Sequence, residues 1–210
     1  AVSELNKAGF DLSNLELVLF VGQNTANGHA FLKGGKATAF IALESYHSTL
    51  YSSVFCAHEI VHALHYQSNP KSFYQSIEEK NSISRLLLTE GIASCVSKRI
   101  LGLSANEALW ADYLDEDSLK GWNERFSGQK RELMTHCLNH LDACDAKAYE
   151  ELFTLSDIEN PFASRTGYKI GLDLIDSIAT NEKLTPIEVL QIDHNRLRKE
   201  LESQVARVKD

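Results

Sequence analysis

Two histidines and a glutamate in the first third of the chain have the types and the spacing of a hydrolytic metal site. His58 and His62 are four residues apart, with Glu59 beside the first, in the pattern H-E-x-x-H. On a helix, residues four apart lie on one face, so both imidazoles can bind one ion. Zinc lowers the pKa of a bound water, and Glu59 would accept its proton as general base. The alternative is an ordinary amphipathic helix with exposed histidines and a solvated glutamate.

A third protein ligand must come from another part of the chain, because a catalytic zinc takes three ligands and keeps one position open. Glu90 is the best candidate, since it interrupts the apolar run of residues 86–93 on a predicted buried helix. An unpaired carboxylate there would be costly. Gly91, the next residue, destabilises a helix by about 1 kcal/mol relative to alanine. A glycine at this position would be explained if the backbone approaches the histidine helix closely.

Three other residues remain as rivals for the third ligand. His65 lies on the ligand face one turn further along, and we expect it to line the pocket. Glu78 and Glu79 lie in a polar stretch, where solvated carboxylates are usual. The metzincin extension would require Gly at position 65 and His at position 68, so His65 and Ser68 exclude that class.

A second histidine pair, His136 and His140, is also four residues apart. Asn139 stands between them in place of a glutamate, and no acidic partner is obvious nearby. We therefore do not expect a second metal site there. Because the two histidines have the spacing of metal ligands on a helix, such a site remains an alternative.

The elements that must position the first site begin with short strands. Residues 15–21 read as a buried strand and residues 22–28 as a loop. Residues 29–33 and 36–43 flank Gly34-Gly35, which predicts an antiparallel hairpin. We expect the edge of strand 36–43 to pair with an extended peptide by strand addition.

From about Ser48 the apolar residues recur with the 3.6-residue period of a helix. One side of this predicted helix is apolar, and the opposite side carries the histidines. A strong helix is predicted over residues 82–101. Ser104 and Thr185 are each followed three residues later by glutamate, which marks two capping boxes. Residues 194–210 read as a polar surface helix.

These elements predict one α+β domain over residues 1–210. Within residues 1–67, a small N-terminal antiparallel sheet packs on the active-site helix. Residues 68–210 form a mainly helical C-terminal lobe that carries the third ligand. The metal site would lie in the cleft between them.

The composition excludes several other classes of protein. With 43% hydrophobic and 24% charged residues, the 210-residue chain resembles an ordinary soluble globular protein. Its 21 basic and 29 acidic side chains give a net charge of −8 without a dense basic cluster, which argues against nucleic acid as a partner. No apolar run reaches the roughly 20 residues of a membrane helix, so we expect no membrane insertion.

The compartment stays open because residue 1 is Ala rather than Met, which leaves room for a removed tag or signal peptide. The first 30 residues themselves have no secretory signal pattern. Four cysteines without CxxC spacing favour a reducing compartment such as the cytoplasm: Cys56, Cys95, Cys137 and Cys144. The oligomeric state is not indicated by the sequence.

The motifs together resemble a known group of metallopeptidases. A-H-E-I-V-H followed by T-E-G-I-A looks like the gluzincin pattern of thermolysin-like folds. More closely, the chain is similar to a bacterial family of predicted zinc-dependent proteases that pairs H-E-x-x-H with E-G-L-A and a later G-Y-x-x-G, here residues 167–171. The resemblance runs from about residue 15 to 193. It implies a zincin-like fold for this single catalytic domain, with His58, His62 and Glu90 as ligands of one Zn²⁺ and Glu59 as base.

The sequence departs from that family pattern at two positions. Ile92 replaces Leu, and Ser94 stands where an acidic residue is expected, so a carboxylate that would orient a histidine from there is missing. The substrate does not carry over from the family.

Tyr168 of the third motif and Arg165, which lies two residues before the first glycine of that motif, are candidates for catalysis. A peptidase needs a hydrogen-bond donor for the oxyanion of its tetrahedral intermediate, and the Tyr168 hydroxyl can supply it. Arg165 would hold a substrate carbonyl or carboxylate. The equally open alternative is that Tyr168 packs at a helix start with its hydroxyl in water and that Arg165 is a surface charge.

The resulting functional hypothesis is zinc-dependent hydrolysis of peptide bonds in a peptide or protein substrate. The alternative is a binding or chaperone-like module that keeps the zincin fold and the metal site but does not cleave. The intact Glu59 favours cleavage. A metal-free helical protein with a chance motif is the third possibility.

Overall fold

The computed structural model describes residues 1–21, 28–45, 48–144 and 146–207. The chain folds into two compact units, which are described separately. The first comprises Ala1–Phe73, Ile92–Tyr113 and Leu184–Gln191, and the second comprises Tyr74–Gly91, Leu114–Lys183 and Ile192–Asp210. That the whole chain is one catalytic domain stays a prediction.

The first unit is built on a three-stranded sheet with the strand order β1-β3-β2. Its strands are β1 (Leu15–Phe20), β2 (Gly28–Lys33) and β3 (Lys36–Ala42). The predicted hairpin of β2 and β3 is confirmed, and both Gly34 and Gly35 in its turn have positive φ. However, β1 pairs parallel with β3, so the sheet is mixed rather than antiparallel throughout.

The central place of β3 corrects the expected site of strand addition. β1 pairs with one edge of β3 from Leu15↔Ala37 onward, and β2 pairs with the other edge. Because both edges of β3 are occupied, residues 36–43 cannot receive a peptide strand, and the prediction was wrong. The predicted loop over residues 22–28 lies outside the described residues except for its last residue.

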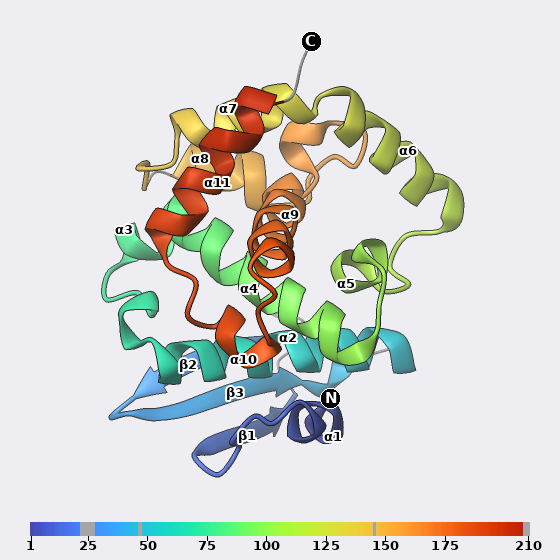
Figure 1. Ribbon diagram of the computed structural model, residues 1–210. Coiled ribbons are helices and arrows are strands. Elements are labelled where there is room, and N and C mark those ends of the chain that lie inside the picture. The colour runs from blue at the N-terminus through green and yellow to red at the C-terminus, as the bar shows by residue number, and fades with distance from the viewer. Residues whose placement is uncertain (22–27, 46–47, 145, 208–210) are drawn as a thin grey trace. The chain divides into compact units, whose positions relative to one another are not determined.

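Helix α2 (Thr49–Ser68) packs on β2 and β3, as Figure 1 shows. Its first turn is capped by Ser48, whose hydroxyl accepts a hydrogen bond of 2.9 Å from the backbone N–H of Tyr51. Small buried side chains on the sheet, among them Ala30 and Ala39, let the helix approach closely. The small N-terminal sheet on the histidine-bearing helix is thus confirmed.

The histidine-lined side of α2 is enclosed as well as its apolar side. Every residue from Val54 to Tyr66 is buried except Cys56, and His65 is not exposed at all. The expected polar front is therefore not a solvent-facing surface. The nitrogens of a buried imidazole need a hydrogen-bond partner or a metal ion. The histidine rings of α2 must therefore find such partners inside the protein rather than in water.

The remaining elements of the first unit are short, apart from the second half of α4 (Ile83–Leu101). Both predicted capping boxes are present, at Ser104 with Glu107 and at Thr185 with Glu188. The short elements are α1 (Val2–Lys7), η1 (Leu43–Ser45), η2 (Pro70–Ser72), α5 (Ala105–Trp110) and α10 (Pro186–Val189).

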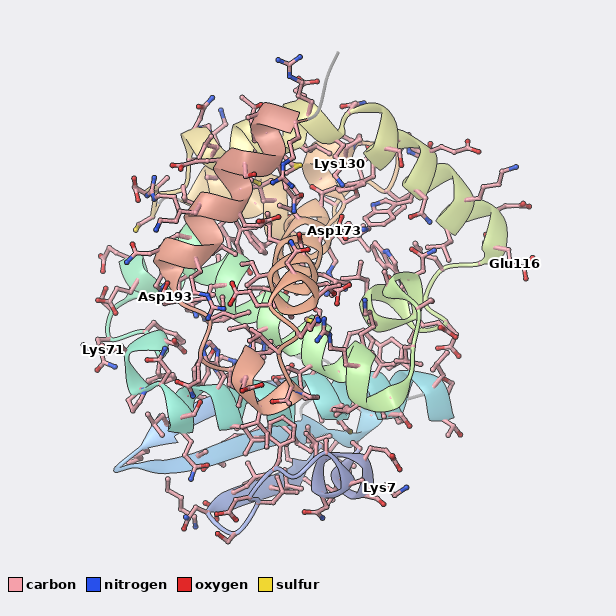
Figure 2. All side chains as sticks on the ribbon, in the orientation of Figure 1. Lys7, Lys71, Glu116, Lys130, Asp173 and Asp193 are labelled. Atoms are coloured by element: carbon pink, nitrogen blue, oxygen red, sulfur yellow. The ribbon has the colours of Figure 1, made fainter. Side chains whose placement is uncertain are left out.

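The second unit is helical and centres on α9 (Thr166–Asn181), which contacts α7, α8 and α11. An ion pair of 3.6 Å between Lys130 of α7 and Asp173 of α9 links two of these helices, and both residues are labelled in Figure 2. The other elements are the first half of α4, α3 (Ile77–Lys80), α6 (Glu116–Gly128), α7 (Lys130–Asn139), α8 (Ala146–Phe153), η3 (Pro161–Ala163) and α11 (His194–Arg207).

The order of the elements along the chain, a small sheet followed by helices, confirms the predicted α+β class. Within the described ranges, no helix combines the length and the apolar character needed to cross a bilayer.

Candidate metal centre

The two histidines of the H-E-x-x-H pattern bring their Nε2 atoms together inside the protein. The atoms are 3.0 Å apart, and the rings are nearly perpendicular, at 82°. Such a contact is a hydrogen bond when one ring carries its proton on Nε2. When both rings carry the proton on Nδ1, two lone pairs meet there instead. Two nitrogens bound to one tetrahedral zinc lie about 3.3 Å apart, so the spacing suits shared coordination.

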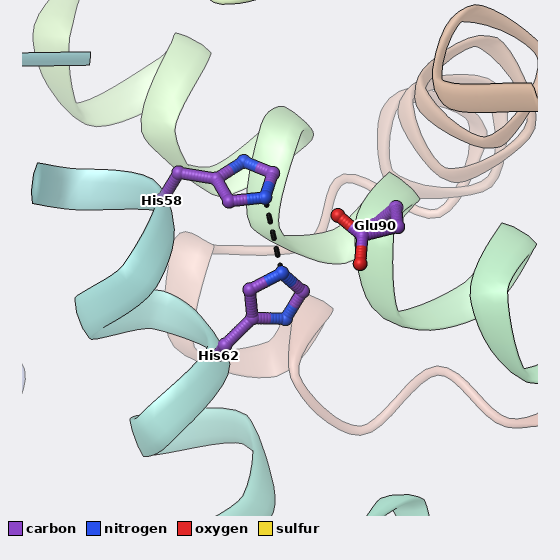
Figure 3. A group of neighbouring side chains, drawn as sticks. All are labelled: His58, His62 and Glu90. Carbon is purple, nitrogen blue, oxygen red and sulfur yellow. Dashed lines mark hydrogen bonds between the residues drawn. The ribbon is translucent and has the colours of Figure 1, made fainter. Parts of the chain in front are cut away.

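Glu90 completes a group of three metal-binding side chains. The ligand atoms of His58, His62 and Glu90 all lie within 4.8 Å of one another. Figure 3 shows the Glu90 carboxylate turned towards the two rings. Glu90 lies on α4, a single continuous helix whose residues from Ile92 onward belong to the same unit as α2. Among the described residues, no other set of three or more histidine, cysteine or acidic side chains meets in this way.

The rivals for the third ligand do not join this group. His65 is completely buried, and its ring stacks on Tyr66 at 5.9 Å between centroids. Glu79 is exposed and accepts a hydrogen bond of 2.6 Å from the backbone N–H of Gln75. Glu78 is also exposed. The geometry therefore favours Glu90 over all three.

Glu59 is adjacent to His58 in sequence but does not belong to the group of three ligand candidates. It is 9% exposed, and its side chain lies against the first residue of β2. A Cβ atom on Gly28 would lie only 2.5 Å from Cγ of Glu59 and 2.9 Å from Cδ. A buried carboxylate beside the ligand group but outside it suits a proton acceptor better than a ligand.

Gly91 makes a close approach, but to a different helix from the one expected. A Cβ atom on Gly91 would lie 2.5 Å from the carbonyl oxygen of Gly171 on α9. The expectation of a close approach to the histidine helix is thus corrected, because the close neighbour that requires a glycine is the backbone of α9. Gly91 belongs to the E-G-I-A segment, and Gly171 is the last residue of the G-Y-K-I-G segment. This contact therefore brings the two segments together.

Tyr168 lies in the first turn of α9, in the same unit as Glu90. Burial raises the pKa of its hydroxyl, and the negative charge of Glu90 raises it further. The Arg165 guanidinium lies 4.3 Å from the centroid of the Tyr168 ring and partly opposes this shift. Arg165 is not a free surface charge, because it packs on this ring and is only partly exposed.

The backbone at Arg165 is unusual for a residue with a side chain. Its φ of 59° and ψ of 28° place it in the left-handed region directly before α9. This conformation costs roughly 1–2 kcal/mol for a residue other than glycine. The backbone N–H of Arg165 donates a hydrogen bond of 2.9 Å to the carbonyl oxygen of Thr154, which helps to hold it.

The second histidine pair has a partner that the sequence did not reveal. His136 Nε2 lies 3.0 Å from a carboxylate oxygen of Glu151 on α8, and the rings of His136 and His140 are 4.2 Å apart. Burial, followed by the charge of His140, lowers the pKa of His136. His136 thus contacts α8 through Glu151, and whether the histidine pair binds a metal stays open.

Two glycines near the site were not recognised as significant from the sequence. Gly28 was assigned to a loop, and Gly171 was seen only as part of a motif. A glycine inside a strand or helix is a weak signal of close backbone approach, but it does not reveal which segment approaches.

The comparisons with known proteins agree with the motifs. A family model described as "Predicted Zn-dependent protease (DUF2268)" matches residues 13–199. No curated protein and no solved structure matches the chain. Because the family model spans most of its length, the chain belongs to this predicted Zn-dependent protease family.

Proposed function

We propose that this member of the predicted Zn-dependent protease family hydrolyses peptide bonds at one zinc ion held by His58, His62 and Glu90. The observation that carries the proposal is the meeting of these three side chains, whose ligand atoms lie within 4.8 Å of one another. When bound, zinc supplies a Lewis acid for the scissile carbonyl and lowers the pKa of a water.

The donor set suits zinc in kind and number. Two imidazole nitrogens and one carboxylate oxygen are typical zinc donors, and three protein ligands leave the fourth position open for substrate or water. His58 and His62 are 7% and 5% exposed, so water is largely excluded from around them. Electrostatic interactions inside such a site are stronger than in bulk water.

We infer that Glu59 acts as the general base. Its carboxylate is adjacent to His58 in the chain but stands outside the group of three ligands. It can take a proton from the attacking water and pass it to the leaving amine. The start of β2 lies directly against its side chain, which would limit the positions that the carboxylate can take.

Tyr168 and Arg165 are assigned to the oxyanion and to substrate binding. The Tyr168 hydroxyl is protonated at neutral pH, as the hydroxyl of any tyrosine with an ordinary or raised pKa is, so it is available as a hydrogen-bond donor. The charge of Glu90 acts on Tyr168, which supports a position near the third ligand. Arg165 packs on the ring and would steady it while its guanidinium binds a substrate carbonyl or carboxylate.

The outer edge of β2 is the better place for an extended peptide substrate. β3 occupies one edge of β2, and no other described strand pairs with the second edge. β2 begins at Gly28, directly against Glu59. A peptide added along this edge by main-chain hydrogen bonds would therefore run past the proposed base.

The experiment that tests this function replaces Glu59 with glutamine. Glu59→Gln should bind one zinc ion per chain as the wild type does, yet should not cleave a peptide library, because an amide cannot accept the proton. The wild-type activity should disappear with a chelator and return with zinc. Wild-type turnover by Glu59→Gln would overturn the mechanism. Zinc and peptide binding by the wild type without any cleavage would favour the non-cleaving binding module instead.

A further inference from the structure

The sheet face that packs on α2 has a side chain at every position of β2 and β3 except one. Cross-strand pairs share a face, and the pairs Ala30↔Ala39 and Leu32↔Ala37 lie on this one. The next pair in the same direction is Gly28↔Ile41. Gly28 is therefore the single position of β2 and β3 on this face from which no side chain extends.

The side chain of Glu59 fills the place that Gly28 leaves. A Cβ atom on Gly28 would lie 2.5 Å from Cγ of Glu59, 2.9 Å from Cδ and 3.1 Å from the carbonyl oxygen of Phe40. Carbon atoms in favourable contact lie about 3.5–4.0 Å apart, so a methyl group cannot enter without moving Glu59 or β2. The backbone of Phe40 is paired on both sides in the central strand, and β2 is paired with that strand from Gly28 onward, so the Glu59 side chain has the most freedom to move.

The backbone conformation does not explain the glycine. Gly28 is the first residue of β2 and pairs with Ile41 in the extended conformation that any residue can adopt. Alanine fits at the neighbouring position on the same face, where Ala30 is buried. The close approach of Glu59 is therefore the feature that requires glycine at position 28.

We propose that Gly28 is a positioning residue for Glu59, whose carboxylate it holds against the start of β2. This inference rests on the proposed role of Glu59 as general base. A methyl group at position 28 would push the carboxylate away from the strand by roughly 1 Å, the difference between 2.5 Å and an ordinary carbon contact. Misplacement of a catalytic group by that distance can cost about 100-fold in rate.

The first test compares Gly28→Ala with Gly128→Ala in the zinc-loaded full chain. A Cβ atom on Gly128, at the end of α6, would meet no atom within 4 Å, so this variant controls for the glycine change itself. Gly28→Ala should lower kcat about 100-fold with little change in KM and with one zinc ion retained. Gly128→Ala should match the wild type. An unchanged kcat in Gly28→Ala, with Glu59→Gln inactive, would overturn the positioning role and leave the proposed function standing.

The second test measures the contact itself without any activity. Gly28→Ala should lower the Tm of the zinc-loaded protein, and the loss should largely vanish in a Glu59→Ala background, where the crowded side chain is absent. If Gly28→Ala does not fold, recovery of folding in the double variant supports the proposal. An equal loss of Tm in both backgrounds, or no recovery, would overturn it. This cycle remains decisive if Glu59→Gln proves active and the proposed function fails.

Discussion

Gly91 and Gly171 bring α4 and α9 into backbone contact: a Cβ atom on Gly91 would lie 2.5 Å from the Gly171 carbonyl oxygen. From the other side, a Cβ atom on Gly171 would lie 2.6 Å from the carbonyl oxygen of Leu87. Gly91 directly follows Glu90, and Gly171 comes three residues after Tyr168. The glycine pair therefore controls how closely the candidate third ligand and the candidate oxyanion donor approach each other.

The contact predicts that Gly171→Ala both destabilises the protein and weakens zinc binding. The added methyl group must separate α4 from α9, and overpacking of this kind costs about 1–3 kcal/mol. Because Glu90 moves with α4, the zinc dissociation constant should rise. Urea unfolding of the metal-free protein and a competitive zinc titration would measure the two effects.

Gly128→Ala serves as the matched control, since its methyl group would meet no atom within 4 Å. It should leave both the stability and the zinc affinity close to wild type. Wild-type zinc affinity in Gly171→Ala, together with a loss of stability, would show that the pair supports the fold without positioning Glu90.

Local signals in the sequence predicted much of this fold. The turn glycines Gly34 and Gly35 marked the hairpin, and the capping boxes at Ser104 and Thr185 marked two helix starts, because each feature is decided within a few residues. The parallel pairing of β1 with β3 was missed, since it joins segments that have no local pattern in common.

The candidate site was predictable to the same extent. The helical spacing of His58 and His62 and the lone carboxylate of Glu90 in an apolar run pointed to three side chains that the fold brings together. The need for a glycine after Glu90 was recognised, but its partner helix was not. Nothing near Gly28 in the sequence indicates Glu59, because their contact depends on how the strand packs against α2.

Zinc binding should depend on each of the three proposed ligands. Single changes of His58, His62 or Glu90 to alanine should each weaken zinc binding by more than about 100-fold, since even the loss of residues that merely support ligands costs 10–100-fold. His140→Ala should keep one zinc ion per chain, as its ring lies outside the group of three. Metal analysis after dialysis against a buffered zinc solution would measure this.

Full zinc occupancy in Glu90→Ala would mean that another residue is the third ligand. If Glu90→Ala keeps full zinc occupancy, then His65, Glu78 or Glu79 must supply the missing donor, and the corresponding double variants would identify which. Loss of zinc in His140→Ala would instead indicate that His136 and His140, at the end of α7, bind zinc.

The cysteines should differ sharply in reactivity towards an alkylating reagent. Burial raises the pKa of the Cys137 thiol to about 12, so at pH 7.5 almost none of it is the reactive thiolate. Cys144 is exposed and free. Mass spectrometry after brief alkylation should find Cys144 modified in the folded protein and Cys137 modified only in denaturant. Rapid labelling of Cys137 without denaturant would contradict its enclosure in α7.

The role of Tyr168 is decided by removing its hydroxyl alone. If Tyr168 donates to the oxyanion, its hydrogen bond matters in the transition state far more than in the ground state. Tyr168→Phe should then lower kcat on the order of 100-fold, or roughly 3 kcal/mol, with little change in KM. Zinc content and Tm should stay close to wild type, because the ring contacts with Phe153 and Arg165 remain.

Arg165→Ala provides the comparison for this result. If the guanidinium holds a substrate carbonyl or carboxylate, its loss should raise KM, and the freed Tyr168 ring should also lower kcat to a smaller degree. Replacement by alanine keeps the strained backbone, whereas Arg165→Gly relieves the positive φ of 59° and separates strain from the side chain. Undiminished kcat in Tyr168→Phe at saturating substrate would leave Tyr168 with a packing role only, because removal of a hydroxyl that makes no hydrogen bond in the transition state does not lower kcat.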